Sequence, residues 1–139
     1  MIRQSTGMLA FTAPRQGLHE ITREIAAWVT SQDIAAGLLT LFCRHTSASL
    51  LIQENAAPAA RRDLEVYFAA IAPESAGYEH DDEGLDDMPA HLRSALTQTQ
   101  LAIPVLDRRL GLGTWQGIYV FEHRREPRSR QVALHLIGE

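Results

Sequence analysis

Apolar and polar positions recur with two different periods along this chain. Near the C-terminus, Val132, Leu134 and Leu136 are separated by single residues that are polar or small, and this period of two is typical of a strand buried on one face. Over residues 58–71, apolar positions recur at spacings of three and four, which predicts a helix with one buried side. Residues 22–32 show the same helical spacing. The chain therefore combines strands with amphipathic helices.

The other apolar segments are short and predict mainly strands. A third helix is expected to begin at Pro89, after the polar segment 73–87. The run 38–44 is apolar on both faces, which is typical of a central strand. The pattern predicts strands over residues 2–12, 18–21, 38–44, 49–53, 101–106, 114–124 and 130–137.

The order of these elements favours one fold class. Two strands, a helix, two strands, two helices and three strands follow one another, without the regular alternation that a parallel sheet requires. We therefore predict an α+β fold with mostly antiparallel strands. No linker or repeat divides the sequence, so residues 1–139 are expected to form a single domain.

Local signals indicate how the helices begin and what they bury. Asn55 is expected to cap the helix that carries Pro58 in its first turn. Asp86 or Asp87 is expected to cap the helix at Pro89. The side chains expected to face the interior from this third helix are Leu92, Ala95 and Leu96. An alternating set in the following strands is also expected to pack in the core: Trp115, Tyr119 and Phe121.

Length and charge exclude several classes of protein. With 139 residues, 45% of them hydrophobic, the chain can bury a core without disulfides or structural zinc. It is too short for a (β/α)₈ barrel or for a dinucleotide-binding fold with a substrate domain. The net charge is −4, so the basic surface typical of nucleic-acid binding is not expected.

Cysteine usage and hydropathy suggest the compartment. Cys43 is the only cysteine and lies in the apolar run before His45, so a disulfide is excluded and a buried, inert thiol is expected. The N-terminus lacks the apolar core of a signal peptide, and no apolar run approaches the ~18 residues of a membrane span. We expect a soluble, cytoplasmic protein with no membrane partner.

Four of the six histidines lie where elements begin or end, and one of these, His123, lies in the predicted strand over residues 114–124. His45 follows a predicted buried strand, His80 lies in the acidic segment 79–87, and His91 lies in the first turn of the Pro89 helix. They do not share the spacing that places two imidazoles on one helix face, so only the fold can bring them together. Each alone is more typical of a surface or hydrogen-bonded histidine. The acidic segment can favour charged imidazoles or supply oxygen ligands to an ion that resembles magnesium.

Two further segments suit the binding of phosphate. Thr46, Ser47 and Ser49 offer hydroxyls, and residues 111–117 offer glycines that let backbone N–H groups approach an anion closely. A hairpin turn at Gly111 and Gly113 explains the glycines equally well. One arginine of the segment 124–130 can reach a bound phosphate.

These motifs together resemble a known family. The segments His45–Leu50, Tyr78–Asp81, Asp86–His91, Ile103–Val105 and Leu112–Ile118 resemble, in order and spacing, the YjbQ family, also called the secondary thiamine-phosphate synthase family. The resemblance spans nearly the whole chain. It implies two packed sheets with flanking helices, assembled as a trimer around a threefold axis.

The resemblance also implies an activity and a site. The activity is a weak or accessory synthesis of thiamine phosphate from a hydroxymethylpyrimidine diphosphate and a thiazole phosphate. His45, His80 and His91 would form one catalytic group, in a pocket lined by Thr46, Ser47, Thr114, Trp115, Gln116 and Gly117. Further candidates for substrate binding are Ser49, Asn55, Gly113 and Arg128.

Several alternatives stay open at this level. Neutral imidazoles bind zinc or another divalent metal, whereas charged imidazoles bind phosphate. Magnesium is expected where the substrate carries a diphosphate. The chain is therefore a synthase that takes a small phosphorylated molecule, a non-catalytic trimeric module that binds a phosphorylated metabolite, or a metal-dependent hydrolase.

Overall fold

The computed structural model describes residues 1–139. Its elements in chain order are β1 (Arg3–Thr12), β2 (Gly17–Glu20), α1 (Thr22–Ser31), β3 (Gly37–Cys43), β4 (Ala48–Glu54), α2 (Pro58–Ile71), α3 (Asp87–Leu96), β5 (Gln100–Leu106), β6 (Arg109–Leu110), β7 (Gln116–Glu122) and β8 (Ser129–Gly138). None of the helices combines the length and hydropathy that spanning a membrane requires.

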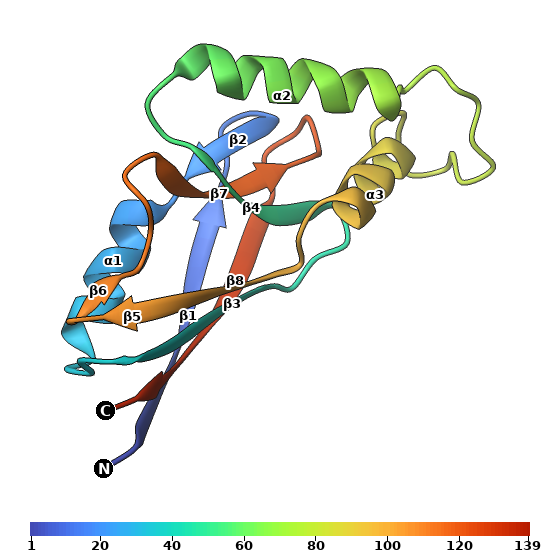
Figure 1. The fold of residues 1–139 in the computed structure, drawn as a ribbon. Helices are drawn as coiled ribbons and strands as arrows, with labels where there is room; N and C mark the ends of the chain where they lie inside the picture. Colours follow the sequence, from blue (N-terminus) through green and yellow to red (C-terminus); the bar gives the residue numbers. More distant parts are fainter.

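The strands form two antiparallel sheets, which confirms the predicted α+β class. One sheet has five strands in the order β1-β8-β3-β5-β6, and the other has three in the order β2-β7-β4. Every hydrogen-bonded pair in both sheets is antiparallel. Figure 1 shows α2 lying across the three-stranded sheet and the two termini side by side.

The main core lies between the two sheets. The alternation in β8 is confirmed, since Val132, Leu134 and Leu136 face this core and are buried. Ile25 and Val29 of α1 pack into the same cluster. Burial of such side chains is the main favourable term in folding.

β7 is buried on both faces because α2 covers the far side of its sheet. Ile118 and Val120 face the main core, whereas Tyr119 and Phe121 join a second cluster beneath α2. The predicted burial of Tyr119 and Phe121 is confirmed. Trp115 precedes the strand and is 64% exposed, so its predicted place in the core is wrong.

The outer face of the five-stranded sheet has no helix over it. β3 is central in this sheet, as predicted, and Leu39 and Leu41 are buried on its inner side. On its outer side Leu38 and Phe42 are exposed, and Met8 and Ile137 from neighbouring strands are exposed as well. This face of the chain is therefore unusually apolar for a surface.

The predicted cap of α2 is wrong. The N-cap residue is Ala57, without a side-chain hydrogen bond. The side-chain amide of Asn55 instead donates to the carbonyls of Thr114 and Gln116, at 3.1 and 3.3 Å. Asn55 therefore ties two loops together, which is an alternative use of a short polar side chain near a helix start.

α3 begins at Asp87, two residues before the expected position, and its inner face is also different. The predicted inward residues Ala95 and Leu96 are exposed. Asp87 and Arg93 are buried instead, and Nη2 of Arg93 donates to the carbonyl of Ala72 at 2.9 Å. Asp86 is the N-cap residue but makes no capping bond with its side chain. Polar anchors rather than apolar side chains orient this helix.

The turn predicted at Gly111 and Gly113 lies a few residues earlier. Asp107 and Arg108 link β5 to the short strand β6, and both have positive φ, 50° and 65°. Two residues with positive φ define a type I′ hairpin turn. The strand β6 was not predicted because it is only two residues long.

Candidate functional site

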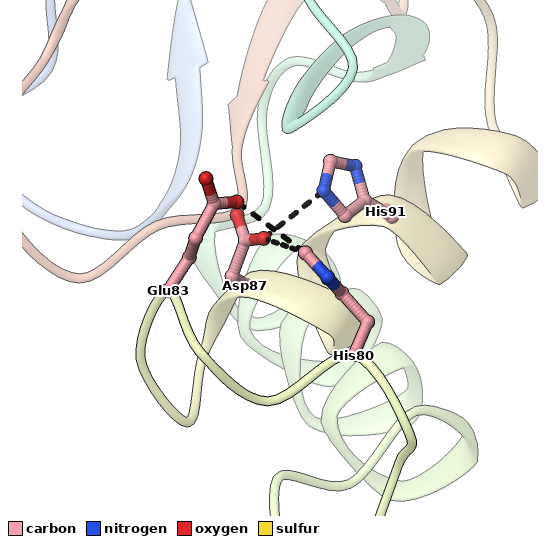
Figure 2. A group of neighbouring side chains, drawn as sticks. All are labelled: His80, Glu83, Asp87 and His91. Atoms are coloured by element: carbon pink, nitrogen blue, oxygen red, sulfur yellow. Dashed lines mark hydrogen bonds and ion pairs between the residues drawn. The ribbon is translucent and has the colours of Figure 1, made fainter.

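Three segments meet at one end of the sheets. The chain leaves β3 after Cys43 and passes through His45, Thr46 and Ser47 into β4. The first turns of α3 lie against this loop, and Nδ1 of His91 is 2.9 Å from the carbonyl oxygen of Thr46. The acidic loop before α3 lies on the other side of the helix start (Figure 2).

Four side chains that can ligate a metal converge at this place. One ligand atom each from His80, Glu83, Asp87 and His91 lies within 4.8 Å of the other three. Oδ2 of Asp87 is central, at 2.8 Å from Nε2 of His80 and 3.1 Å from Nε2 of His91. Oε2 of Glu83 is 3.3 Å from Nε2 of His80. We call these four residues the cation cluster.

The tautomer of His91 follows from its partners. A carbonyl oxygen only accepts hydrogen bonds, so Nδ1 of His91 must donate its proton to Thr46. In a neutral imidazole this leaves Nε2 with a lone pair directed at the Asp87 carboxylate. Two such electron-rich atoms 3.1 Å apart require a proton or a metal ion between them.

The two carboxylate oxygens of Asp87 have different hydrogen-bond partners, Arg124 for Oδ1 and the two histidines for Oδ2. Burial alone would raise the pKa of Asp87, but its hydrogen bonds and the charges of His91 and Arg124 outweigh this and lower the pKa. The side chain is 4% exposed, and Oδ1 accepts from Nη1 of Arg124 at 2.7 Å. The same carboxylate raises the pKa of His80 through its hydrogen bond.

A pocket of about 850 Å³ adjoins the cation cluster and shares His91 with it. Its walls carry hydroxyls, imidazoles and one guanidinium but no carboxylate. The lining residues are Phe42, Cys43, Arg44, His45, Thr46, Ser47, His91, Ser94, Ala95 and Thr99. We call this cavity the His45 pocket.

His45 lies in the pocket but not in the cation cluster. Its Nε2 accepts a hydrogen bond from the backbone N–H of Gln131 at 2.8 Å. Burial lowers the pKa of His45, and the nearby charge of Arg130 lowers it further, so the imidazole is held neutral. The predicted group of three histidines is therefore divided: His80 and His91 share the cluster, and His45 faces the adjoining pocket.

Two other predicted residues lie outside the pocket. Ser49 is 1% exposed, and its hydroxyl is 2.9 Å from Nε2 of the buried His123. Arg128 is not among the residues that line the pocket. Thr46 and Ser47 do line it, as predicted, and the predicted burial of the Cys43 thiol is confirmed.

The remaining candidates lie at the opposite end of β4 and β7. In this pair Ala48 is opposite Glu122 near the pocket, whereas Glu54 is opposite Gln116 at the far end. The far end carries Asn55, Gly113, Thr114, Trp115, Gln116 and Gly117. There the N–H of Gly113 already donates to the side chain of Gln116 at 2.8 Å. Within one chain these residues do not line the His45 pocket.

Several residues that build the site were not singled out from the sequence. The sequence places Glu83 in an acidic segment and offers Asp87 as a helix cap, but it predicts neither as a ligand, although Asp87 and His91 have the i, i+4 spacing that places side chains on one helix face. Glu122 and Arg130 form a buried ion pair, with Nη2 2.5 Å from Oε2. Arg130 also donates to the carbonyl of Ser47 at 3.1 Å and so fixes the loop beside His45.

The fold and the site define a small α+β protein that carries a histidine and carboxylate cluster beside an open pocket. Comparison with known sequences identifies the group of proteins to which it is related. The chain belongs to the YjbQ family, whose description is "UPF0047 protein YjbQ-like" and whose pattern matches residues 8–139.

Individual relatives match over nearly the full chain. The UPF0047 protein sll1880 of Synechocystis is 49% identical, covering 99% of this chain and 94% of its own length. The UPF0047 protein YjbQ of Escherichia coli O157:H7 is 42% identical, covering 94% of this chain and 96% of its own. The predicted family is thereby confirmed, and these names assign no activity.

Solved structures share the fold. A YbjQ-like protein of unknown function from Sulfolobus solfataricus has a TM-score of 0.92, with 23% identity and full coverage of both chains. The conserved hypothetical protein TT1486 from Thermus thermophilus has a TM-score of 0.79 and is 33% identical, covering 92% of this chain and 97% of its own.

Proposed function

We propose that this protein is an enzyme that uses a divalent cation to act on a small phosphorylated molecule. The observation that carries the proposal is the convergence of His80, Glu83, Asp87 and His91 beside a pocket free of carboxylates. His91 belongs to both, so a ligand in the pocket would lie next to the cation. A cation held there would polarise a phosphoryl oxygen and lower the pKa of a bound water.

The residues of the cation cluster fit such an ion. Ligand atoms about 2.0–2.2 Å from one ion lie at most about 4.4 Å apart. The four atoms lie within 4.8 Å of one another, so they need to approach by only about 0.4 Å to share one ion. Two imidazole nitrogens and two carboxylate oxygens suit zinc, manganese or iron better than magnesium, which prefers oxygen ligands only. The Thr46 carbonyl and Arg124 support His91 and Asp87 from behind, as partners of metal ligands commonly do.

The pocket favours an anionic ligand. Arg44 contributes a positive charge, and Thr46, Ser47 and Thr99 contribute hydroxyl donors, whereas the Ser94 hydroxyl already donates to the carbonyl of Ala48 at 3.2 Å. A phosphoryl group accepts hydrogen bonds from these donors and from the Nδ1–H of His45, whose Nε2 is already occupied. Magnesium would enter this pocket with a diphosphate substrate rather than bind to the imidazoles.

The reaction that the family resemblance suggests is the formation of thiamine phosphate. A carbon–nitrogen bond forms between the pyrimidine and the thiazole while the carbon–oxygen bond to diphosphate breaks, and diphosphate leaves with the electron pair. In this proposal His45 and Arg44 bind the leaving diphosphate and so stabilise its developing charge. His91 and Asp87 would hold the cation next to this pocket, where it would supply further positive charge for the leaving group.

A second candidate is a metal-dependent hydrolase, which the mixed donors of the cation cluster favour. Catalytic zinc sites combine histidine with carboxylate ligands and keep one position open for water. In that case the pocket binds a phosphate ester, and the products are inorganic phosphate and an alcohol. Both candidates use the same cluster and pocket, so turnover must distinguish them.

One set of assays tests the proposal. Metal-free protein is reloaded with Zn²⁺, Mn²⁺ or Mg²⁺ and given the pyrimidine diphosphate with the thiazole phosphate, or a phosphomonoester alone. We expect thiamine phosphate to form only with metal and only when Asp87 is intact, with Asp87→Asn as the inactive variant. Metal-dependent release of phosphate without thiamine phosphate would favour the hydrolase.

The His45 variant separates the pocket from the cation cluster. His45→Ala is expected to weaken binding of the phosphorylated compound while metal binding is retained, because His45 lies outside the cluster. If phosphorylated compounds raise the melting temperature of the metal-loaded protein but none is consumed, the protein is a binding module and the enzyme proposal fails.

A further inference from the structure

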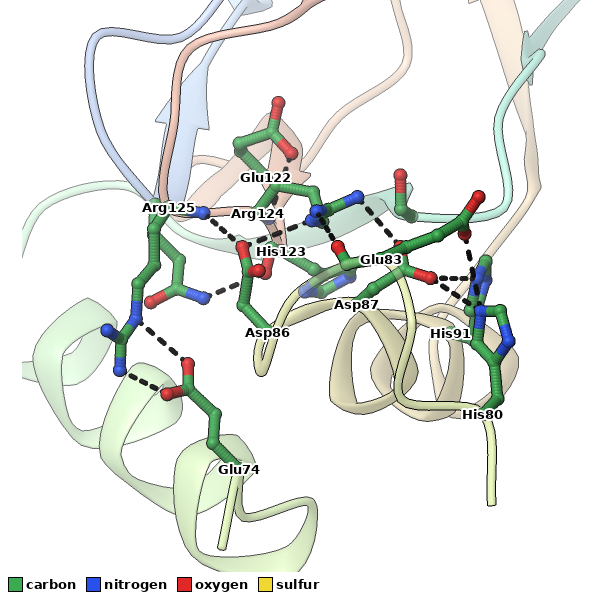
Figure 3. Close-up of polar contacts among 12 residues, drawn as sticks. Glu74, His80, Glu83, Asp86, Asp87, His91, Glu122, His123, Arg124 and Arg125 are labelled. Atoms are coloured by element: carbon green, nitrogen blue, oxygen red, sulfur yellow. Dashed lines mark hydrogen bonds and ion pairs between the residues drawn. The ribbon is translucent and has the colours of Figure 1, made fainter. Parts of the chain in front are cut away.

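Arg124 contacts three parts of the segment that carries the cation cluster. It follows β7, which ends at Glu122, and its side chain is 11% exposed. Nη1 donates to Oδ1 of Asp87 at 2.7 Å, and Nε donates to Oδ2 of Asp86 at 3.1 Å. Nη2 donates to the carbonyl of Glu83 at 2.9 Å. Figure 3 shows this guanidinium between the two aspartates and the loop.

These contacts determine how Asp87 faces the histidines. A carboxylate turns easily about its last bond, so its orientation depends on the partners of its two oxygens. Arg124 occupies Oδ1, and only Oδ2 is left for His80 and His91. Asp86 is held by a further hydrogen bond, since its Oδ2 accepts from the backbone N–H of Arg125 at 2.8 Å. The guanidinium therefore joins the end of β7 to the loop and to the first residue of α3.

We propose that Arg124 is a positioning residue for the cation cluster. It holds Oδ2 of Asp87 and the backbone of Glu83 where the four ligand atoms converge, and it is not a ligand because a guanidinium has no lone pair to donate. This inference rests on the proposed function, because it assumes that the cluster binds a cation.

Positioning and simple electrostatics predict opposite results for one substitution. Removing a positive charge close to the cluster should tighten cation binding if charge alone matters. Removing the residue that orients Asp87 should weaken it. Arg125 provides a matched control, because it is the next residue, carries the same charge and pairs with Glu74, and its side chain is 65% exposed.

The test is a titration of the metal-free protein with cobalt chloride, followed by visible absorption. We expect Arg124→Gln to weaken cobalt binding about 10- to 100-fold, the usual effect of losing a partner of a metal ligand, and to change the absorption spectrum. Arg124→Lys keeps the charge, but its single nitrogen cannot reach all three acceptors at once. The affinity of this variant for cobalt should therefore fall about tenfold. Arg125→Gln should bind as the wild type does.

The outcomes separate this inference from the proposed function. Urea unfolding of each variant identifies those that fold. If Arg124→Gln does not fold, the cobalt affinity of Arg124→Lys decides the test. A wild type that binds cobalt, with folded Arg124 variants that bind equally or more tightly, would overturn the positioning role alone. A wild type that binds no cobalt would overturn the proposed function and this inference with it.

Discussion

At the scale of single residues, His123 makes the stability of the protein depend on pH. The imidazole is fully buried, and burial, followed by the charges of Arg93 and Arg130, lowers its pKa to about 3. An unfolded chain has the usual value of about 6.5. Between these two values the unfolded state binds the additional proton, so stability decreases as the pH falls.

His123→Gln tests this effect. The wild type is expected to lose about 2–3 kcal/mol of unfolding free energy between about pH 7 and pH 4.5 through this residue. The variant should lose correspondingly less, because glutamine does not titrate and its amide can still reach the Ser49 hydroxyl. Urea midpoints measured across this range check it, with His19→Gln, a partly exposed histidine of β2, as the control. Equal pH dependence of the variant and the wild type would contradict the role of His123.

At the scale of elements, the buried pair of Glu122 and Arg130 connects β7, β8 and the loop beside His45. Arg130→Met leaves the Glu122 charge buried and unpaired, which typically costs about 3–5 kcal/mol. It also removes the donor to the Ser47 carbonyl. We expect the double variant Glu122→Leu with Arg130→Met to be clearly more stable than Arg130→Met alone, because it leaves no unpaired buried charge.

Chemical unfolding of these variants provides the measurement. Arg108→Met is the control, because Arg108 forms an exposed pair with Asp33, and such pairs contribute about 0–1 kcal/mol. If Arg130→Met lowered the free energy of unfolding as little as Arg108→Met does, the pair of Glu122 and Arg130 would not hold these elements together.

Elements with a clear hydrophobic period could be predicted from the sequence, and those held by polar contacts could not. The alternation at Val132, Leu134 and Leu136 identified β8 because one face of that strand packs in the core. The inner face of α3 was missed because Asp87 and Arg93 are buried there through long-range partners. Such partners leave no periodic signal in the sequence.

The candidate site also has one part that the sequence predicts and one part that it does not. His80 and His91 were identified as candidates, and the fold brings them together through Asp87. The separation of His45 from that cluster depends on the backbone of Gln131, far along the chain. Nothing in the residue types indicates such a contact, so the predicted group of three histidines could not be resolved from the sequence.

At the scale of the whole molecule, the exposed outer face of the five-stranded sheet suggests assembly. Met8, Leu38, Phe42 and Ile137 expose apolar surface there, and sheet faces of this kind are normally covered. We propose that copies of the chain pack over this face, and the number three comes from the family resemblance.

Light scattering is expected to give about three times the 15.5 kDa mass of one chain. Ile137→Lys should shift the mass toward that of the monomer without loss of secondary structure, because a charge on this face opposes its burial. A wild-type mass near 15.5 kDa at micromolar concentration would refute the trimer.

The central claim is that His80, Glu83, Asp87 and His91 bind one divalent cation. Calorimetric titration of the metal-free wild type with Zn²⁺ tests this most directly, beside His91→Ala and the control His19→Ala, a partly exposed histidine of β2. We predict one zinc per chain for the wild type and the control, and at least about tenfold weaker binding for His91→Ala. A wild type that binds no zinc, or a folded His91→Ala variant that binds it unchanged, would contradict the account.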